Sequence, residues 1–105
     1  MNLIDFIDTL KDNKKLTQYM ENFYPDIDYY DAEVYLKDTL SIDSELVIFD
    51  GDKIEGMIEM EIDKTKYYNL FSLDLLVETF EDYFDLSKTN IDIANDIMSY
   101  RINDA

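Results

Sequence analysis

Residues 44–63 constrain the fold more than any other segment, because two apolar runs in it flank the dipeptide Asp50-Gly51. Asp-Gly between hydrophobic runs is a strong local signal for a β-hairpin, since glycine adopts a positive φ without steric cost. In the second run, apolar and acidic residues alternate. Period-two alternation places successive side chains on opposite faces of a strand. The pattern therefore predicts a hairpin over 45–62 with one buried and one solvent-exposed face.

The exposed face of this predicted hairpin carries a row of carboxylates. The row consists of Glu55, Glu59, Glu61 and Asp63, and the residues expected on the buried face are Ile54, Ile58, Met60 and Ile62. A solvated strand face is the ordinary explanation of such a row. However, residues 26–63 hold thirteen acids and only two lysines. Like charges set against each other destabilise a sheet, so we interpret this acidic surface as one that meets a basic partner.

The first part of the chain is expected to form two short amphipathic helices. Apolar residues recur at i, i+3, i+4 and i+7 over 2–12 and again over 13–23. Asn2 is a suitable N-cap for the first helix, and Pro25 ends the second because the residue before a proline avoids the α region. We expect these helices to pack as an antiparallel pair.

The remaining segments complete an α+β fold. Residues 31–40 fit a helix or a strand, and we favour the helix, whereas 64–71 suit a third strand. Ser72 precedes a broad apolar stripe, and the capping box Thr89–Asp92 opens a last helix. The predicted fold is a small antiparallel hairpin or three-stranded sheet over about 44–71, packed by the N-terminal helix pair and two C-terminal helices.

Composition limits the chemistry available to the chain. Its 105 residues predict a single acidic domain, 1–105, with a net charge of −16, and 47% hydrophobic residues indicate that it folds. Cysteine and histidine are absent from the sequence, which removes disulfides, thiolate chemistry and the usual zinc ligands and general base. No apolar run approaches the ~18 residues of a membrane span. We expect a cytoplasmic protein, acting in its own cell or in another, with no cofactor.

Asp-rich loops suggest calcium, but their spacing does not fit. An EF-hand loop needs acids at positions 1, 3 and 5, glycine at 6 and glutamate at 12. A loop starting at Asp50 has Ile54 and Glu55 at positions 5 and 6, and one starting at Asp26 has Tyr30 and Asp31 there. We therefore predict no metal site. Because the chain has no histidine or cysteine to work with a serine or threonine, we also predict no catalytic residues. Direct nucleic-acid binding is excluded because the acidic chain repels phosphates.

Tyrosines beside the acids are candidates for an interface, because aromatic residues are enriched in interface cores and receive arginine by stacking. For each of them, burial under the loop is an equally good explanation. The candidate partner-binding residues are Asp26, Asp28, Tyr29, Tyr30, Asp31, Glu33, Asp50, Asp52, Glu55, Glu59, Glu61 and Asp63.

In size and composition, though not by any motif, the chain is similar to the small acidic inhibitors that phages direct at host nucleases. Some of those inhibitors are DNA mimics that block CRISPR effectors, restriction enzymes or uracil-DNA glycosylase. The likeness implies a non-enzymatic counter-defence protein, monomeric or homodimeric, that occupies the basic nucleic-acid groove of a partner such as a CRISPR effector or other nuclease. The alternatives are an immunity protein that neutralises a basic toxin nuclease, and an ordinary acidic interaction module.

Overall fold

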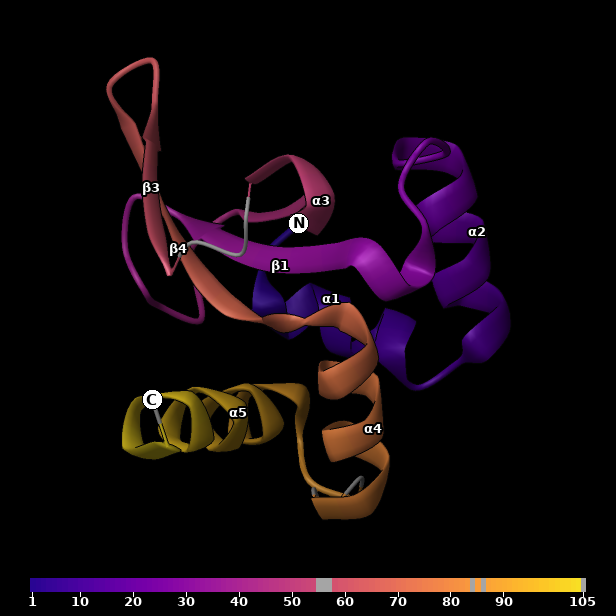
Figure 1. Cartoon of the computed structure of the whole chain (residues 1–105). Coiled ribbons are helices and arrows are strands. Elements are labelled where there is room, and N and C mark those ends of the chain that lie inside the picture. The colour runs from indigo at the N-terminus through magenta and orange to yellow at the C-terminus, as the bar shows by residue number, and fades with distance from the viewer. Residues whose placement is uncertain (55–57, 84, 86, 105) are drawn as a thin grey trace.

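A computed structural model describes residues 1–54, 58–83, 85 and 87–104 and confirms the α+β class (Figure 1). Helices and the strands of one antiparallel sheet follow one another along the chain in no regular order. The elements are α1 (Leu3–Leu10), α2 (Asn13–Phe23), the 3-10 helix η1 (Tyr29–Asp31), β1 (Ala32–Lys37), β2 (Leu46–Asp50), α3 (Gly51–Ile54), β3 (Glu59–Ile62), β4 (Thr65–Ser72), α4 (Leu73–Tyr83) and α5 (Asn90–Asp104). The N-terminal helix pair and the two C-terminal helices thus occur where the sequence predicts them.

The sheet has four strands in the order β2-β1-β4-β3, which corrects the predicted hairpin over 45–62. Strand β2 does not pair with β3; instead it pairs with β1, and the chain then crosses to the opposite edge of the sheet. The dipeptide Asp50-Gly51 lies at the junction of β2 and the short helix α3 rather than in a hairpin turn. The predicted third strand over 64–71 is confirmed as β4, and its partner in a tight hairpin is β3.

The hairpin turn of the sheet is Asp63-Lys64, which contains no glycine. Both residues have positive φ values, 50° and 69°, and they connect the paired residues Ile62 and Thr65. Two successive positive φ values define a type I′ turn, whose twist matches that of the flanking strands. The turn therefore forms at two residues that adopt the left-handed region at a steric cost.

Residues 31–40 do not form the helix that we favoured; most of them belong to β1, one of the two inner strands. Val34, Tyr35 and Leu36 are consecutive and fully buried, which a strand allows only if both faces of the sheet are covered. The spacing of Ala32, Tyr35 and Leu36 also fits a helix, so the apolar pattern alone favoured the wrong element. Pairing with both β2 and β4 decides the conformation.

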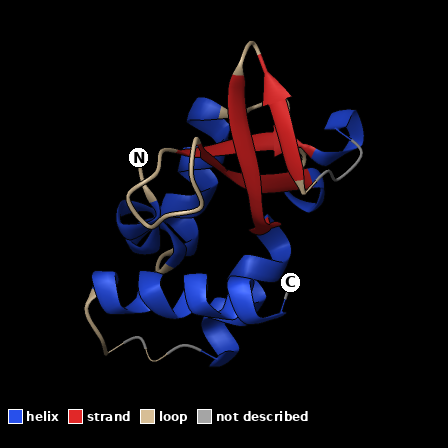
Figure 2. Ribbon diagram, turned by 90° about the vertical axis from the view of Figure 1, so that its left-hand side faces the viewer, coloured by secondary structure: helices blue, strands red, loops and turns tan. Residues whose placement is uncertain are grey.

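Helices α1, α4 and α5 lie on one side of the sheet, and the β3–β4 hairpin extends away from them (Figure 2). This face and the helices share one core, whose largest members are Leu3, Phe6, Ile7, Val34, Leu36, Ile48, Leu70, Leu73, Leu76, Phe80, Ile93 and Ile97. Each such side chain contributes about 1.5–3 kcal/mol on burial. On the opposite face, Tyr35, Phe49 and Tyr67 from three strands stack edge to face.

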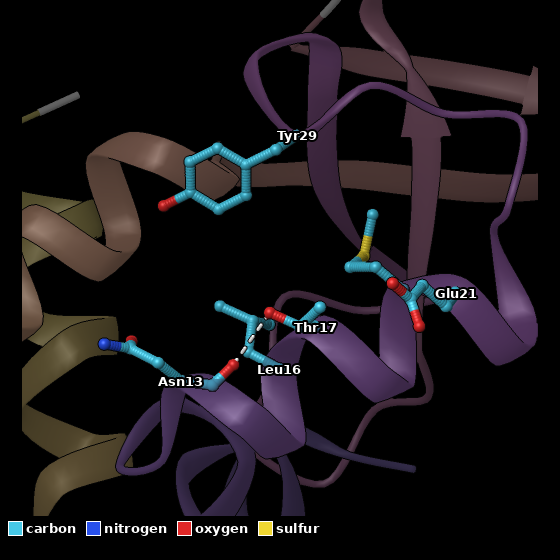
Figure 3. Close-up of a pocket in the computed structure, with 6 residues that line it drawn as sticks. Asn13, Leu16, Thr17, Glu21 and Tyr29 are labelled. Atoms are coloured by element: carbon cyan, nitrogen blue, oxygen red, sulfur yellow. Dashed lines mark hydrogen bonds between the residues drawn. The ribbon is translucent and has the colours of Figure 1, made fainter.

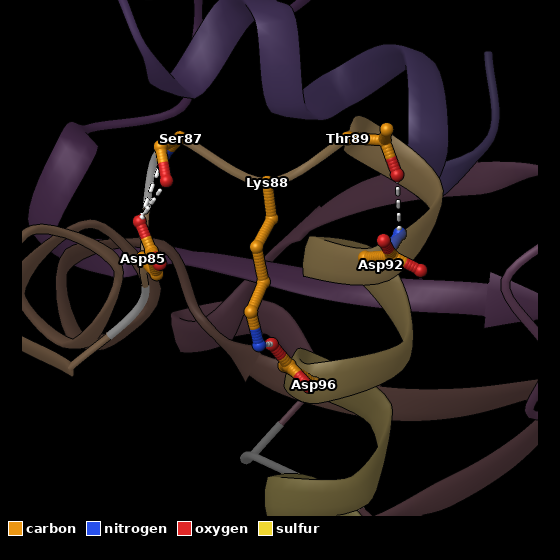
Figure 4. Close-up of polar contacts among 6 residues, drawn as sticks. All are labelled: Asp85, Ser87, Lys88, Thr89, Asp92 and Asp96. Atoms are coloured by element: carbon orange, nitrogen blue, oxygen red, sulfur yellow. Dashed lines mark hydrogen bonds and ion pairs between the residues drawn. The ribbon is translucent and has the colours of Figure 1, made fainter.

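Local hydrogen bonds fix the helix ends as the sequence predicts. The Asn2 side chain accepts a hydrogen bond from the Asp5 N–H at the start of α1. At the start of α5, the Asp92 N–H donates to Thr89 Oγ1 over 3.3 Å, which is one half of the predicted capping box (Figure 4). Lys88 reaches along the helix to Asp96, with its Nζ 3.1 Å from the carboxylate. The connection between α4 and α5 is thus held by polar contacts.

We predict that Lys64→Gly stabilises the protein by about 1 kcal/mol, because glycine relieves the steric cost of a left-handed residue. Urea unfolding measures the change. Lys64→Ala is the matched control, since it removes the same charge but keeps the Cβ atom, and it should give no gain. Equal effects of the two substitutions would contradict the type I′ turn.

Candidate functional site

Strand pairing gathers acidic residues at one corner of the sheet. Ala32 lies opposite Asp50 in the β1–β2 register, so Asp31 at the start of β1 and Asp50 at the end of β2 are neighbours. Carboxylate oxygens of Asp31, Asp50 and Asp52 all lie within 4.8 Å of one another. We call the wider group the acidic corner; it consists of Asp28, Asp31, Glu33, Asp50, Asp52 and Asp74.

Gly51 permits this close approach. A Cβ atom on residue 51 would lie 2.9 Å from the carbonyl oxygen of Asp31 and 3.1 Å from Cγ of Glu33, so any side chain there pushes the backbone segments apart. The Asp52 N–H donates to Asp50 Oδ1 over 3.0 Å, which fixes the turn between the two acids. Gly51 is therefore needed because the backbone packs closely at the corner, and not because a hairpin turn requires it.

The electrostatics of the corner favour protonation. The pKa of Asp31 is raised above its ordinary value, first by desolvation and then by the charges of Asp52, Asp28 and Asp50. Burial also raises the pKa of Glu33, although the Asn69 amide, which donates to this carboxylate over 3.2 Å, partly offsets the rise. The charge of Asp74, at the start of α4, raises the pKa of Glu33 further.

Among the described residues no lysine or arginine forms an ion pair with the corner, although Lys53 follows Asp52 directly in α3. The three ion pairs among the described residues are Lys37–Glu45, Lys66–Glu59 and Lys88–Asp96, and all of them lie elsewhere. Uncompensated like charges at such short distances repel each other and oppose folding. The acidic corner therefore carries an excess of negative charge, which a cation or a cationic partner can compensate.

The structure separates the predicted site residues into two groups. Asp28, Asp31, Glu33, Asp50 and Asp52 belong to the corner. Glu59 and Glu61 are exposed on β3 and Asp63 is exposed in the hairpin turn, at the other edge of the sheet. Asp26 is exposed on the loop after α2, and Glu55 lies outside the described residues. Of the described members of the predicted row, Glu59 and Glu61 lie exposed on β3 and Asp63 lies in the turn, so this part of the row is separate from the corner.

The expected buried face of the acidic segment also needs correction. Ile58 is 71% exposed and Ile62 is 41% exposed, whereas only Met60 between them is buried. The hairpin extends beyond the helices that cover the rest of the sheet (Figure 2), so little of β3 faces a core. A polar substitution at Ile58 is therefore not expected to unfold the domain.

The candidate tyrosines have different environments. Tyr30 is 75% exposed beside the acidic corner, with its ring 5.1 Å from that of Tyr29. Tyr29 forms one wall of a largely apolar groove of about 320 Å³, facing Leu16 and Thr17 of α2 (Figure 3). Tyr35, in contrast, is fully buried in the sheet. Tyr29 and Tyr30 are thus the tyrosines that the fold places at a candidate interface.

Sequence reasoning missed both Asp74 and this groove. Asp74 lies in the first turn of α4, directly after β4, and no sequence motif marks it as a site residue. The groove depends on the position of η1 against α2. Neither arrangement has a local sequence signal, because each is produced by contacts between distant segments.

The side chains of this region are suited to holding cationic groups. The corner offers only carboxylates, and the groove is lined by Asn13, Leu16, Thr17, Met20, Glu21 and Tyr29. Clustered carboxylates attract lysine and arginine side chains or hard metal ions. An exposed tyrosine next to them offers a face on which a guanidinium group stacks.

Comparison of the chain with protein-family models, with curated proteins and with solved structures returned no match. Within the described residues, none of the helices is both long enough and apolar enough to cross a bilayer.

Mild acid should stabilise the fold. An acid whose pKa is higher in the folded than in the unfolded chain binds its proton more tightly when folded, so the stabilisation is lost as the pH rises through the folded pKa. For Asp31 and Glu33 these pKa values lie above the ordinary 3.8 and 4.5. Asp85, whose pKa is lowered by hydrogen bonds from Ser87, stays ionised over the same range.

The melting temperature is therefore expected to rise as the pH falls from 7 towards 5, and Asp31→Asn should raise it at pH 7 and weaken its pH dependence. Asp43→Asn, at an exposed loop residue, is the control for charge alone. If both variants keep the wild-type pH dependence, the corner does not carry the effect.

We predict that calcium acts on the corner only by general screening. Asp31, Asp50 and Asp52 bring three carboxylates together, but their positions in the sequence do not match the EF-hand loop, which supplies about 6–8 oxygen ligands to calcium. Thermal unfolding in calcium and in magnesium measures the response. A saturable rise in melting temperature at micromolar calcium that magnesium does not reproduce would identify a specific site and contradict this prediction.

Proposed function

We propose that the protein is a small non-enzymatic inhibitor that binds the basic nucleic-acid-binding surface of another protein through its acidic corner. The observation that carries the proposal is the close group of Asp31, Asp50 and Asp52, which has no cationic partner among the described residues. Such a group costs the isolated fold stability and is compensated when a cationic surface covers it. The net charge of −16 extends the attraction beyond the contact itself.

A nucleic-acid-binding surface fits this corner better than a generic basic patch does. Arginine and lysine residues that bind phosphates are arranged for closely spaced negative charge, and the arginine fork binds carboxylates in the same bidentate way. An acidic protein in that groove therefore competes with DNA or RNA. A CRISPR effector, with its basic channel for the heteroduplex and its PAM-reading arginines, is the partner class that we propose, and the protein is then a phage or mobile-element counter-defence protein.

Tyr30 and the neighbouring groove supplement the charge. Interfaces obtain most of their binding energy from a few desolvated anchors, often aromatic residues. Tyr30 is 75% exposed and lies in η1 between Tyr29, which walls the groove, and Asp31 of the corner. A partner that covers the corner can therefore stack an arginine on Tyr30 and insert an apolar side chain against Leu16.

The triple variant Asp31→Asn, Asp50→Asn, Asp52→Asn is expected to weaken binding by about tenfold or more, because charged pairs across an interface set the association rate and its salt dependence. The measurement is biolayer interferometry against a panel of purified partners: a guide-loaded Cas9-type effector, a restriction endonuclease and uracil-DNA glycosylase. Wild-type binding should weaken with added salt and compete with duplex DNA.

The control is Asp5→Asn, Asp43→Asn, Asp92→Asn, which removes the same number of charges at exposed positions away from the corner. It should change affinity only slightly, and the corner variant should be the more stable of the two. Equal binding by both triple variants contradicts the corner as the interface. A complex that retains its full affinity for DNA contradicts occupation of the nucleic-acid groove.

A further inference from the structure

The two edges of the sheet are treated differently by the fold. On the β2 edge, the Leu46 N–H donates to the Met1 carbonyl over 2.8 Å and the Ile48 N–H donates to the Tyr24 hydroxyl over 3.3 Å. On the β3 edge, no hydrogen bond between described residues reaches the outer backbone groups. The β2 edge is thus covered by the chain itself, whereas the described residues leave the β3 edge uncovered.

The register identifies the open groups. The Asn69 N–H donates to the Ile58 carbonyl over 2.8 Å, so Asn69 and Ile58 form a hydrogen-bonded pair of the antiparallel ladder. Hydrogen-bonded and non-hydrogen-bonded pairs alternate along such a ladder, and Met60 therefore exchanges its bonds with Tyr67. Glu59 and Glu61 in turn direct their N–H and C=O groups outward, to the free edge.

Side chains on the two sides of this edge differ in character. Ile58 and Ile62 project on one side and are 71% and 41% exposed. Glu59 and Glu61 are exposed on the other side, where Lys66 makes an ion pair of 3.5 Å with Glu59. Lys66 also lies opposite Glu61 in the strand register. Two neighbouring glutamates therefore share one lysine, and the edge keeps a negative charge.

We propose that β3 is a strand-addition site that pairs with an extended segment of a partner protein, with lysine or arginine on one side of that segment and aliphatic residues on the other. The backbone groups of Glu59 and Glu61 supply hydrogen bonds, their carboxylates meet the basic side chains, and Ile58 and Ile62 meet the aliphatic ones. Strand addition of this kind takes its affinity from the main chain and its specificity from alternating side chains.

A second copy of this chain fits the edge poorly. Two antiparallel β3 strands centred on Met60 would set Glu59 of each copy against Glu61 of the other, and like charges directly opposite destabilise a pair. Each copy also carries a net charge of −16. The same alternation that discourages self-association therefore selects a basic strand.

This inference does not rest on the proposed function. Glu59 lies opposite Tyr68, which pairs with Leu36 near the end of β1, whereas the acidic corner lies at the start of β1. The corner variant Asp31→Asn, Asp50→Asn, Asp52→Asn should therefore retain binding at β3. Either proposal can fail without the other.

The test is an NMR titration of the full chain with a capped heptapeptide of alternating lysine and valine. A second peptide of the same sequence carries N-methyl groups on alternate residues, which block strand pairing, and a third replaces lysine with glutamate. We expect the first peptide to shift the amide signals of residues 58–62 saturably and to slow hydrogen exchange at Glu59 and Glu61. The other two peptides should not.

Two variants separate the contribution of the Glu61 backbone N–H to binding from that of its charge. Glu61→Pro removes an outward N–H while leaving the β3–β4 hydrogen bonds in place, as prolines on edge strands do, and Glu61→Ala removes the charge alone. The proline variant should bind the lysine–valine peptide more weakly than the alanine variant does. Equal binding of the N-methylated peptide to the wild-type chain, shifts confined to the acidic corner, or peptide-independent dimers in sedimentation would overturn the proposal.

Discussion

Strand β1 holds the structure together, because it is hydrogen-bonded on both sides and buried on both faces. Pairing with β2 and β4 aligns Val34 and Leu36 with the helical core and Tyr35 with the aromatic stack of Phe49 and Tyr67. The same register places Asp50 beside the start of β1. The core, the second apolar layer and the acidic corner therefore share one set of backbone hydrogen bonds, and a shift of register by one residue would exchange the two faces of the strand.

Local signals predicted the helices well. Asn2 caps α1, Thr89 caps α5 and α2 ends before Pro25, as the sequence indicates. The two errors in the sheet have a common cause, since strand conformation and hairpin pairing depend on distant residues. Asp50-Gly51 fulfils the local requirement of a turn, but Gly51 is needed for its approach to the Asp31 carbonyl. The real turn, Asp63-Lys64, contains no glycine, and the sequence pattern therefore did not identify it.

The sequence indicated which acidic residues would lie at the surface, but it did not indicate how the fold would group them. Acids between 26 and 63 were expected at the surface, and those of the corner have no cationic partner among the described residues. Their division between the corner and β3 follows from the strand order β2-β1-β4-β3, which no local pattern specifies. Asp74 joins the corner from α4, far along the chain, and could only be found once the fold was known.

The strand order also has a consequence for the speed of folding. The β3–β4 hairpin closes through two residues, but it lies largely outside the core. The pairing of β1 with β4 must instead close the whole segment 38–64 before it gains any contact. Loop-closure entropy is spent before non-local pairs form, so we expect the pairing of β1 with β4 to be slower than closure of the β3–β4 hairpin. The early hairpin then offers its open edge to solvent during the interval in which the core is still unformed.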